Sequence, residues 1–388
     1  MRQLLKDLAV ICAGQGAPQG DNNYCENGTP FVKAGNLQEL LEGKAITSIR
    51  KVSDEVAKKH KLKLYPKGTI LFAKSGMSCM KGYVYVLPQS AYVVSHLACV
   101  TPNEDASEYL RYFFNYHKPN QLVKDAAYPS ISLSDIGNLV VDMKSESERN
   151  AIVSVLQHAE SVITLRQKEL QKLDELVKAR FVEMFGDMYL NTMEWRELQL
   201  ETMADIVSGI TKGRKIAGKQ LTKVPYMAVS NVKDGYIDWT TVKTIEATDQ
   251  EINQYRLLPD DVLMTEGGDP DKLGRGAIIR TPLENCIHQN HIFRVRLDES
   301  HILPDYFAEY LKHQRAKRYF LGCAKQTTGI ASINMKQLKA LPVLLPPLEL
   351  QNEFSAFIRQ IDKSKVVVQK ALDEAQTLFD SLMQQYFG

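Results

Sequence analysis

One segment of this 388-residue chain occurs twice, at a constant offset of 202 residues. The first copy, "SISLSDIGNLVV", begins at Ser130, and the second, "SINMKQLKALPV", begins at Ser332. The same offset carries through later identities and aligns Phe185 with Phe387, next to the end of the chain. Because self-similarity over so long a stretch encodes one supersecondary unit twice, the chain is predicted to consist of two related halves.

Upstream of this segment the halves diverge, although matching landmarks remain. Gly14 corresponds to Gly209, "TPFVKAGNL" corresponds to "VPYMAVSNV", and "LYPKGTILFAKSG" corresponds to "LLPDDVLMTEGG". The offset drifts between these landmarks, as insertions in surface loops would cause. Each half is therefore predicted to be a variable module followed by a better-preserved tail.

Both tails have the pattern of long amphipathic helices. Apolar residues recur at threes and fours between Ile152 and Met184, and no Pro or Gly interrupts the segment from Ser145 to Phe185. The second tail follows a double proline, which suits a helix N-terminus. About 40 residues at ~1.5 Å per residue give a helix near 60 Å. Because an amphipathic helix of this length needs a partner, we expect the two to pair antiparallel, with the modules at opposite ends and an approximate twofold axis between them.

The modules contain short β-branched or aromatic runs bounded by Gly, Pro and Asn, each module then continuing into a helical pattern. The predicted fold class is α+β: two mixed α/β domains separated by two long helices that form an antiparallel coiled coil with a pseudo-twofold internal repeat. The predicted boundaries are 1–144 for module 1, 145–187 for the first helix, 188–346 for module 2 and 347–388 for the second helix.

Composition excludes several protein classes. No apolar run approaches the ~18 residues of a membrane span, and "MRQLLKDLAVICAG" is too short and too polar for a signal peptide. Six cysteines without C-x-x-C spacing suggest neither a disulfide framework nor a zinc site and fit a reducing cytoplasm. The net charge of +2 argues against indiscriminate coating of polyanions, although local basic patches could still read nucleic acid.

The sequence resembles the specificity subunit of type I restriction-modification systems over essentially its whole length. The resemblance is carried by the duplicated tails, the module openings at Gly14 and Gly209 with "GITKGRKI", the segments "GTILFAKSG" and "DVLMTEGGDPDKLGRGAIIR", and the two "FG" endings. "LPPLELQNEF" resembles the family's entry into the second helix, whereas "DMKSESERNAI" in the first copy lacks the double proline.

This resemblance implies a non-catalytic DNA reader. Two target-recognition domains would each bind one half of a bipartite, asymmetric site, and the paired helices would set the gap. Two methyltransferase subunits would dock on the helices, and a restriction/translocase subunit would join them. No cofactor is expected in this chain, with S-adenosylmethionine, ATP and Mg expected only on partner subunits in the cytoplasm. The resemblance transfers no base-contacting residue and leaves the bases, the gap length and the methylated base open.

Candidate DNA-contacting residues lie in basic or polar loops, where cations and amides can bind phosphates and base edges. In module 2 they are Lys212, Arg214, Lys215, Lys219, Asn231, Lys272, Arg275, Lys325, Gln326 and Thr327. In module 1 they are Lys33, Asn36, Lys74, Ser75, Lys81, Lys124 and Tyr128. The competing interpretation of each loop is a solvated turn, and for the basic run Lys312 to Phe320 it is a solvated helix face. We expect Ser130 and Ser332 to cap helices, and His96 and His291 to be hydrogen-bonded structural residues.

Two other functions remain possible at this point. The loop from Gly213 to Lys219 nearly spells a P-loop, but Gln220 stands where Ser or Thr should hold magnesium. A diverged nuclease or nucleotide-binding enzyme is thus one alternative, and a helical scaffold without a DNA role is another. The chain shows no N-P-P-aromatic or D-P-P-aromatic signature of an aminomethyltransferase, so no catalysis by the chain alone is expected.

Overall fold

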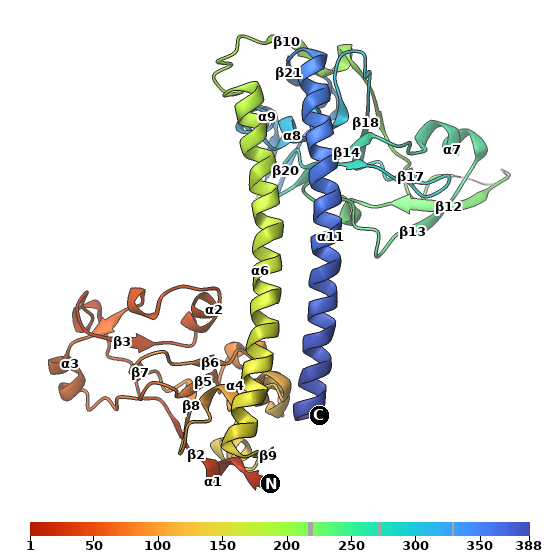
Figure 1. The fold of residues 1–388 in the computed structure, drawn as a ribbon. Helices are drawn as coiled ribbons and strands as arrows, with labels where there is room; N and C mark the ends of the chain where they lie inside the picture. The colour runs from red at the N-terminus through yellow and green to blue at the C-terminus, as the bar shows by residue number, and fades with distance from the viewer. Residues whose placement is uncertain (216–219, 270–272, 328–329) are drawn as a thin grey trace. The chain divides into compact units, whose positions relative to one another are not determined.

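The computed structural model describes residues 1–215, 220–269, 273–327 and 330–388, with only the backbone of 326, 327 and 330. The chain forms two compact units (Figure 1). Unit 1 consists of Met1–Gln167 and Lys370–Gly388, and unit 2 consists of Lys168–Gln369. Each unit thus joins one module to a part of both long helices. Among the described residues, no helix is long and apolar enough to cross a membrane.

Unit 1 contains three small sheets, with strand orders β1-β9, β2-β8-β5-β6 and β4-β3-β7. Its strands are β1 (Arg2–Leu4), β2 (Ala9–Ala13), β3 (Thr29–Val32), β4 (Lys51–Val52), β5 (Ile70–Ala73), β6 (Tyr85–Val86), β7 (Tyr92–Val93), β8 (Leu97–Pro102) and β9 (Val140–Asp142). Its short helices are α1 (Leu5–Leu8), α2 (Asn36–Leu41), α3 (Asp54–Lys59), α4 (Ser107–Tyr116) and α5 (Leu133–Gly137), with 3-10 turns η1 (Asp21–Asn23), η2 (Ile46–Ser48), η3 (Met77–Lys81) and η4 (Pro119–Leu122). All strand pairs are antiparallel except β3 with β7.

Unit 2 repeats this plan. Strand orders β10-β21, β11-β18-β14-β16 and β13-β12-β17 reproduce the three sheets, including one parallel pair, and β15-β20-β19 is added. The strands are β10 (Arg196–Gln199), β11 (Ala204–Ser208), β12 (Thr222–Met227), β13 (Lys243–Ala247), β14 (Asp261–Thr265), β15 (Gly267–Gly268), β16 (Gly276–Ile279), β17 (Ile287–His288), β18 (Ile292–Leu297), β19 (Lys325–Thr327), β20 (Ile330–Ser332) and β21 (Pro342–Leu345). The helices are α7 (Asp249–Tyr255), α8 (Pro304–Lys312), α9 (Gln314–Cys323) and α10 (Met335–Lys339), with 3-10 turns η5 (Leu200–Thr202) and η6 (Val229–Asn231).

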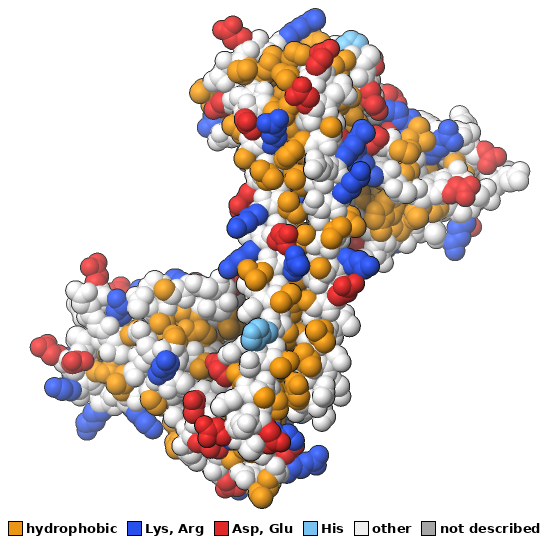
Figure 2. Space-filling view, in the orientation of Figure 1, with side chains coloured by type: hydrophobic (Ala, Val, Ile, Leu, Met, Phe, Trp, Pro, Cys, Tyr) orange, Lys and Arg blue, Asp and Glu red, His pale blue; other side chains and the backbone are white. Residues whose placement is uncertain are grey.

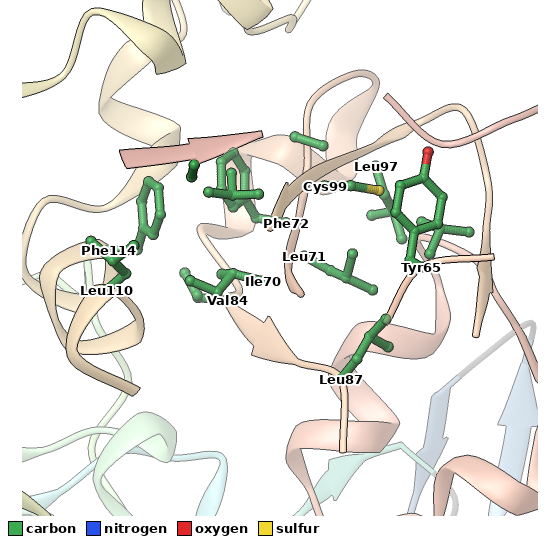
Figure 3. Packing of buried hydrophobic residues seen from close by; sticks show 14 of the residues in the cluster. Tyr65, Ile70, Leu71, Phe72, Val84, Leu87, Leu97, Cys99, Leu110 and Phe114 are labelled. Atoms are coloured by element: carbon green, nitrogen blue, oxygen red, sulfur yellow. The ribbon is translucent and has the colours of Figure 1, made fainter. Parts of the chain in front are cut away.

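The core of unit 1 forms where the four-stranded sheet meets α4. All four residues of β5 are buried, and α4 turns Leu110 and Phe114 toward them (Figure 3). The rings of Phe72 and Phe114 have centroids 5.0 Å apart. Burying side chains of this size contributes roughly 1.5–3 kcal/mol each. This packing fixes the end of β5, from which the candidate site of unit 1 emerges.

The two long helices are α6 (Glu146–Phe185) and α11 (Leu348–Phe387). In unit 1 the first part of α6 shares a core with the last part of α11, including Leu156 and Met383. In unit 2 the last part of α6 meets the first part of α11, where the rings of Phe181 and Phe354 lie 5.5 Å apart. The helices are antiparallel in both units, so the predicted long helices and their pairing are confirmed.

The first helix begins without a double proline because Ser145 caps it. Ser145 Oγ accepts a bond from Glu148 N (3.4 Å), and Glu148 Oε2 accepts one from Ser145 N (3.0 Å). This reciprocal capping box satisfies amides that have no partner inside the helix. The two copies therefore start equivalent helices by different means.

Equivalent hydrogen bonds confirm the internal repeat. The backbone bonds from Lys74 N to His96 O (2.9 Å) and from Ile131 N to Lys74 O (2.8 Å) correspond to those from Glu266 N to His291 O (3.0 Å) and from Ile333 N to Glu266 O (2.9 Å). The opening glycines match as well. A Cβ built on Gly14 would lie 2.2 Å from Val94 O, and one on Gly209 would lie 2.0 Å from His288 O. Only glycine fits at either position.

Two expectations about local structure are wrong. The N-cap residues of α5 and α10 are Ser132 and Asn334, because the helices begin three residues after Ser130 and Ser332. Ser130 instead bridges to Ser75, and Ser332 pairs with Gly267. The helical pattern into which module 2 continues, from Pro304 onward, is also interrupted. It breaks at His313, whose extended backbone ends α8 and whose side chain accepts a bond from Arg315 N.

Candidate nucleic-acid interface

In unit 1 the chain leaving β5 lies beside two other loops. Ser75 Oγ is 2.8 Å from His96 Nδ1, and the segment before α5 joins through the bond from Gly76 N to Pro129 O (3.0 Å). Lys74 and Ser75 are half-buried, whereas Tyr128 is 81% exposed. The structure therefore brings together the predicted residues Lys74, Ser75 and Tyr128 and adds His96.

The remaining candidates of unit 1 sit on neighbouring segments. Lys81 Nζ donates to Gln38 Oε1 on α2 (3.1 Å), so η3 and α2 are joined close to Asn36 at the start of that helix. Asn36 Oδ1 accepts a bond from Lys33 N (2.9 Å). Lys33 Nζ lies 4.9 Å from the centre of the Tyr24 ring.

Lys124 is highly exposed and forms an ion pair with Asp135 on α5 (2.9 Å). Hydrogen bonds from Lys124 and then from Ser132 hold the pKa of the Asp135 carboxyl below its usual range. An exposed pair of this kind is weak and screened by salt, so a phosphate can compete for the ammonium group.

In unit 2 the added sheet carries three of the ten candidates. Strand β20 pairs on one side with β15, which follows β14, and on the other side with β19, so one strand separates the backbone of Lys325, Gln326 and Thr327 from the segment after β14. Arg275 joins this group because its carbonyl accepts a bond from Thr265 N (3.3 Å). The Nε atom of Arg275 is buried without a partner among the described atoms. Lys272 and the side chains of Gln326 and Thr327 lie outside the described residues.

The basic residues of the loop after Gly209 have different roles. Lys212 and Lys215 are exposed, whereas Arg214 forms a two-pronged pair with Glu251 of α7 at 2.5 and 2.8 Å. The hydrogen bond from Arg214, opposed by partial burial and aided by Thr248, lowers the pKa of Glu251 to about 2. Arg214 therefore fixes the loop onto α7 and leaves the two lysines facing solvent. Lys219 lies outside the described residues.

Asn231 is fully buried, with both polar ends of its side chain bonded. Its Oδ1 accepts from Ala228 N, and its Nδ2 donates to Asp238 O, both at 2.9 Å. The first of these bonds repeats the one that Asn36 makes to Lys33 N. In this structure Asn231 organises the turn after β12, and its amide does not reach the surface.

The basic run from Lys312 to Phe320 is only partly a solvated face. Arg315 pairs with Glu197 and donates to the carbonyls of Met188 (3.2 Å) and Tyr189 (3.1 Å). These bonds tie α9 to the segment that follows α6. At least one charged side chain of this run, Arg315, therefore holds two segments of unit 2 together instead of only facing solvent.

The two matching histidines, His96 and His291, were expected to be structural, and the acid beside His291 was not predicted. Both are hydrogen-bonded as expected and both are exposed, and His291 Nδ1 lies 2.6 Å from Glu266 Oε2. Glu266 occupies the position of Lys74 in unit 1, since the backbone of each bonds to an equivalent histidine and an equivalent isoleucine. The equivalent positions therefore carry opposite charges. Aligning the ends of β5 and β14 would have shown this contrast.

The family of the chain follows from a comparison with known domains. The profile of the "Type I restriction modification DNA specificity domain" matches residues 3–175 and again residues 193–375. The chain belongs to the type I restriction-modification DNA specificity family. Both copies of the specificity domain match, in agreement with the repeated topology of units 1 and 2.

Members of the specificity family are similar to the chain over different lengths. It is 22% identical over 384 residues to the type I restriction enzyme StySPI specificity subunit of Salmonella potsdam, covering 93% of this chain and 81% of that protein. It is 26% identical over 196 residues to the putative MjaX specificity subunit of Methanocaldococcus jannaschii and over 162 residues to the EcoKI specificity subunit of Escherichia coli K12. The last two matches cover 50% and 41% of this chain but only 45% and 35% of those proteins.

Two solved structures show the same fold. The S subunit of a type I restriction-modification system from M. genitalium superposes with a TM-score of 0.59 at 14% identity, covering 100% of this chain and 96% of that one. A chain from a study of complex assembly and conformational transition in the type I R-M system gives a TM-score of 0.59 at 16% identity, with coverage of 100% and 97%. The specificity fold is thus shared across the full length.

Proposed function

We propose that this chain is the non-catalytic DNA-recognition subunit of a type I restriction-modification assembly. The observation that carries the proposal is the presence of two specificity domains in one chain, at residues 3–175 and 193–375. One scaffold used twice can present two sets of loops to DNA. Each unit would then read one half of a bipartite site.

Chemical differences between the units support unequal half-sites. At the equivalent position after the central strand, unit 1 carries Lys74 and unit 2 carries Glu266 paired with His291. A lysine suits phosphates and acceptor-rich guanine edges, whereas a glutamate accepts a bond from the cytosine amino group. The basic loop with Lys212 and Lys215 adds phosphate-binding charge to unit 2.

Exposed apolar side chains on the long helices support docking of partner subunits. These side chains, which include Val162, Leu165, Leu176, Val366, Val367 and Leu378, are each more than 40% exposed. Figure 2 shows hydrophobic side chains along the visible face of the helices, interspersed with charges of both signs. We propose that two methyltransferase subunits bind there and that a restriction/translocase subunit joins the assembly.

In this proposal the helices fix the gap between the half-sites, and the assembly works in the cytoplasm. The partner subunits, not this chain, hold S-adenosylmethionine, ATP and magnesium. The candidate contact residues, including Arg275, Lys325 and Tyr128, serve DNA binding in their respective units.

Selection from a pool of random duplexes by the full-length chain, co-purified with methyltransferase subunits from its source, tests the proposal. The expected product is one motif with two specified blocks of unequal sequence and a fixed unspecified gap. Recovery of unenriched DNA would favour a scaffold without a DNA role. Nucleotide hydrolysis by the purified single chain would favour an enzyme instead.

A further inference from the structure

Two cysteines of unit 1 face each other across neighbouring strands. Cys12 on β2 is in register with Cys99 on β8. In the same ladder, Gly14 N donates to Leu97 O at 3.0 Å, two residues further along each strand. Since hydrogen-bonded pairs recur every second residue in an antiparallel ladder, Cys12 and Cys99 form such a pair, with Cα atoms ~5.5 Å apart. This separation lies within the ~4.4–6.8 Å that disulfides span.

The two sulfurs differ in their access to solvent. Cys99 is fully buried, whereas Cys12 is only half-buried. The Tyr65 hydroxyl lies 3.6 Å from Cys12 Sγ, and Lys63 Nζ lies 4.0 Å from the same sulfur. Figure 3 shows the Cys99 sulfur directly beside the Tyr65 ring. A small reagent from solvent can therefore reach the Cys12 thiol, whereas the Cys99 thiol is shielded from solvent.

Neighbouring groups also separate the two thiols chemically. The hydrogen bond from Cys99, assisted by Tyr65 and Lys63 and opposed by burial, lowers the pKa of Cys12 to about 6. The same pairing, followed by burial, raises the pKa of Cys99. The lower pKa makes Cys12 the more readily deprotonated, and therefore the more nucleophilic, of the two thiols.

Unit 2 shows that the shared fold does not require these cysteines. The equivalent strands β11 and β18 pair Val207 with Arg294 at the corresponding register position. In the equivalent ladder of unit 2, a valine and an arginine thus occupy the positions of the two cysteines. The thiol pair is thus a property of unit 1 alone, and neither sulfur is among the candidate DNA contacts.

We infer that Cys12 and Cys99 form an oxidisable thiol pair, which hydrogen peroxide converts to a cross-strand disulfide between β2 and β8. The Cys12 thiolate attacks one peroxide oxygen, an S–O bond forms as the O–O bond breaks, and the departing hydroxide takes a proton. Cys99 sulfur then attacks Cys12 sulfur, the S–S bond forms, and the S–O bond breaks. The second hydroxide leaves with the Cys99 proton as water. Two thiols are oxidised and one hydrogen peroxide is reduced.

Treatment of the reduced full-length chain with hydrogen peroxide, followed by intact-mass measurement and peptide mapping, tests the inference. The expected result is loss of two hydrogen atoms and two titratable thiols, with the Cys12 and Cys99 peptides linked. Oxidation of Cys25 or Cys323 while Cys12 and Cys99 remain free would overturn it. So would conversion of Cys12 to sulfinic or sulfonic acid without capture by Cys99.

Variants separate the two thiols. With Cys99→Ala, Cys12 should stop at the sulfenic acid and be trapped by dimedone, and with Cys12→Ser, Cys99 should stay reduced. Cys25→Ser is the matched control and should leave the linkage unchanged. Lys63 is exposed, so Lys63→Gln tests the electrostatics without disturbing the core. It should shift the pH midpoint of Cys12 alkylation upward, and an unchanged midpoint would remove the ammonium group from the proposed site.

Discussion

At the residue scale, the strictest constraints come from two glycines that open equivalent turns. A Cβ on Gly14 or Gly209 would approach backbone carbonyl oxygens to 2.2 and 2.0 Å, and the backbone cannot move aside as a flexible side chain would. Gly14→Ala and Gly209→Ala should each reduce the free energy of unfolding by more than about 3 kcal/mol. Gly16→Ala is the control, because nothing lies within 4 Å of its Cβ position.

Hydrogen exchange of individual peptides shows which unit loses stability in each variant. Protection should fall mainly in unit 1 for Gly14→Ala and mainly in unit 2 for Gly209→Ala. Wild-type protection in both variants would show that the close approach at these glycines is relaxed in solution.

The ion pair of Arg214 and Glu251 should make unit 2 sensitive to acid. Because the pKa of Glu251 falls from 4.5 to about 2 on folding, its stabilisation is present above pH 4.5 and is lost as the pH drops toward 2. Arg214→Gln should remove this part of the pH dependence, whereas Lys215→Gln, in the same loop, should keep it. Urea unfolding between pH 5 and pH 2 measures the difference, and identical curves for wild type and Arg214→Gln would contradict the prediction.

Residue types indicated where the loops lie but not which side chains remain available. Arg214 and Lys215 look alike in the sequence, yet only the arginine meets Glu251, which is 37 positions away. Asn231 was a candidate from its place in the repeat, and the fold buries it under its own turn. Whether a side chain is available to bind DNA depends on its partners in the tertiary structure, which the local sequence does not show.

At the element scale, the caps of the short helices can be tested with matched serines. Ser132 Oγ accepts a bond from Asp135 N (2.9 Å) at the start of α5, whereas Ser130, also exposed, caps no helix. Ser132→Ala should cost about 1 kcal/mol of unfolding free energy and Ser130→Ala less than about 0.5 kcal/mol. Thermal unfolding of both variants compares them, and a larger loss for Ser130→Ala would reverse the assignment.

The basic loop of unit 2 should contribute to DNA affinity through charge alone. Lys212→Ala with Lys215→Ala should lower the slope of log affinity against log salt by about 2, because two fewer counterions are released. Binding to a selected duplex at several salt concentrations measures this slope. The control is Lys58→Ala with Lys59→Ala on α3, outside the candidate loops, which should leave the slope unchanged. An unchanged slope for the loop variant would exclude the loop from the interface.

The long helices were predictable because their signals are local and repeated over many turns. Apolar spacing and the lack of Pro and Gly defined α6 and α11. The break at His313 was not predictable, since the residues on both sides have a helical pattern and the contact of the His313 ring with Phe181 of α6, at 6.3 Å between ring centres, is a tertiary one. The helix caps were predicted two residues too early for a similar reason. Ser130 and Ser132 are both serines, and the bridge between Ser130 and Ser75 leaves Ser132 to cap α5.

At the scale of the whole molecule, the central claim is that one recognition fold is built twice and carries unlike chemistry at equivalent positions. The constant offset of 202 residues was enough to predict the doubling. Equivalent bonds at Lys74 and Glu266 confirm it in atomic detail. The chemistry of the loops in the two units was harder to infer, because these loops diverge in sequence while the fold that carries them does not.

Duplex selection with Lys74→Gln and with Glu266→Gln, each compared with wild type, tests this claim most directly. We predict that the wild-type motif has two blocks separated by a gap. The first substitution should change base preference in one block only, and the second in the other block only. A single uninterrupted motif, or the same bases altered by both substitutions, would contradict the account.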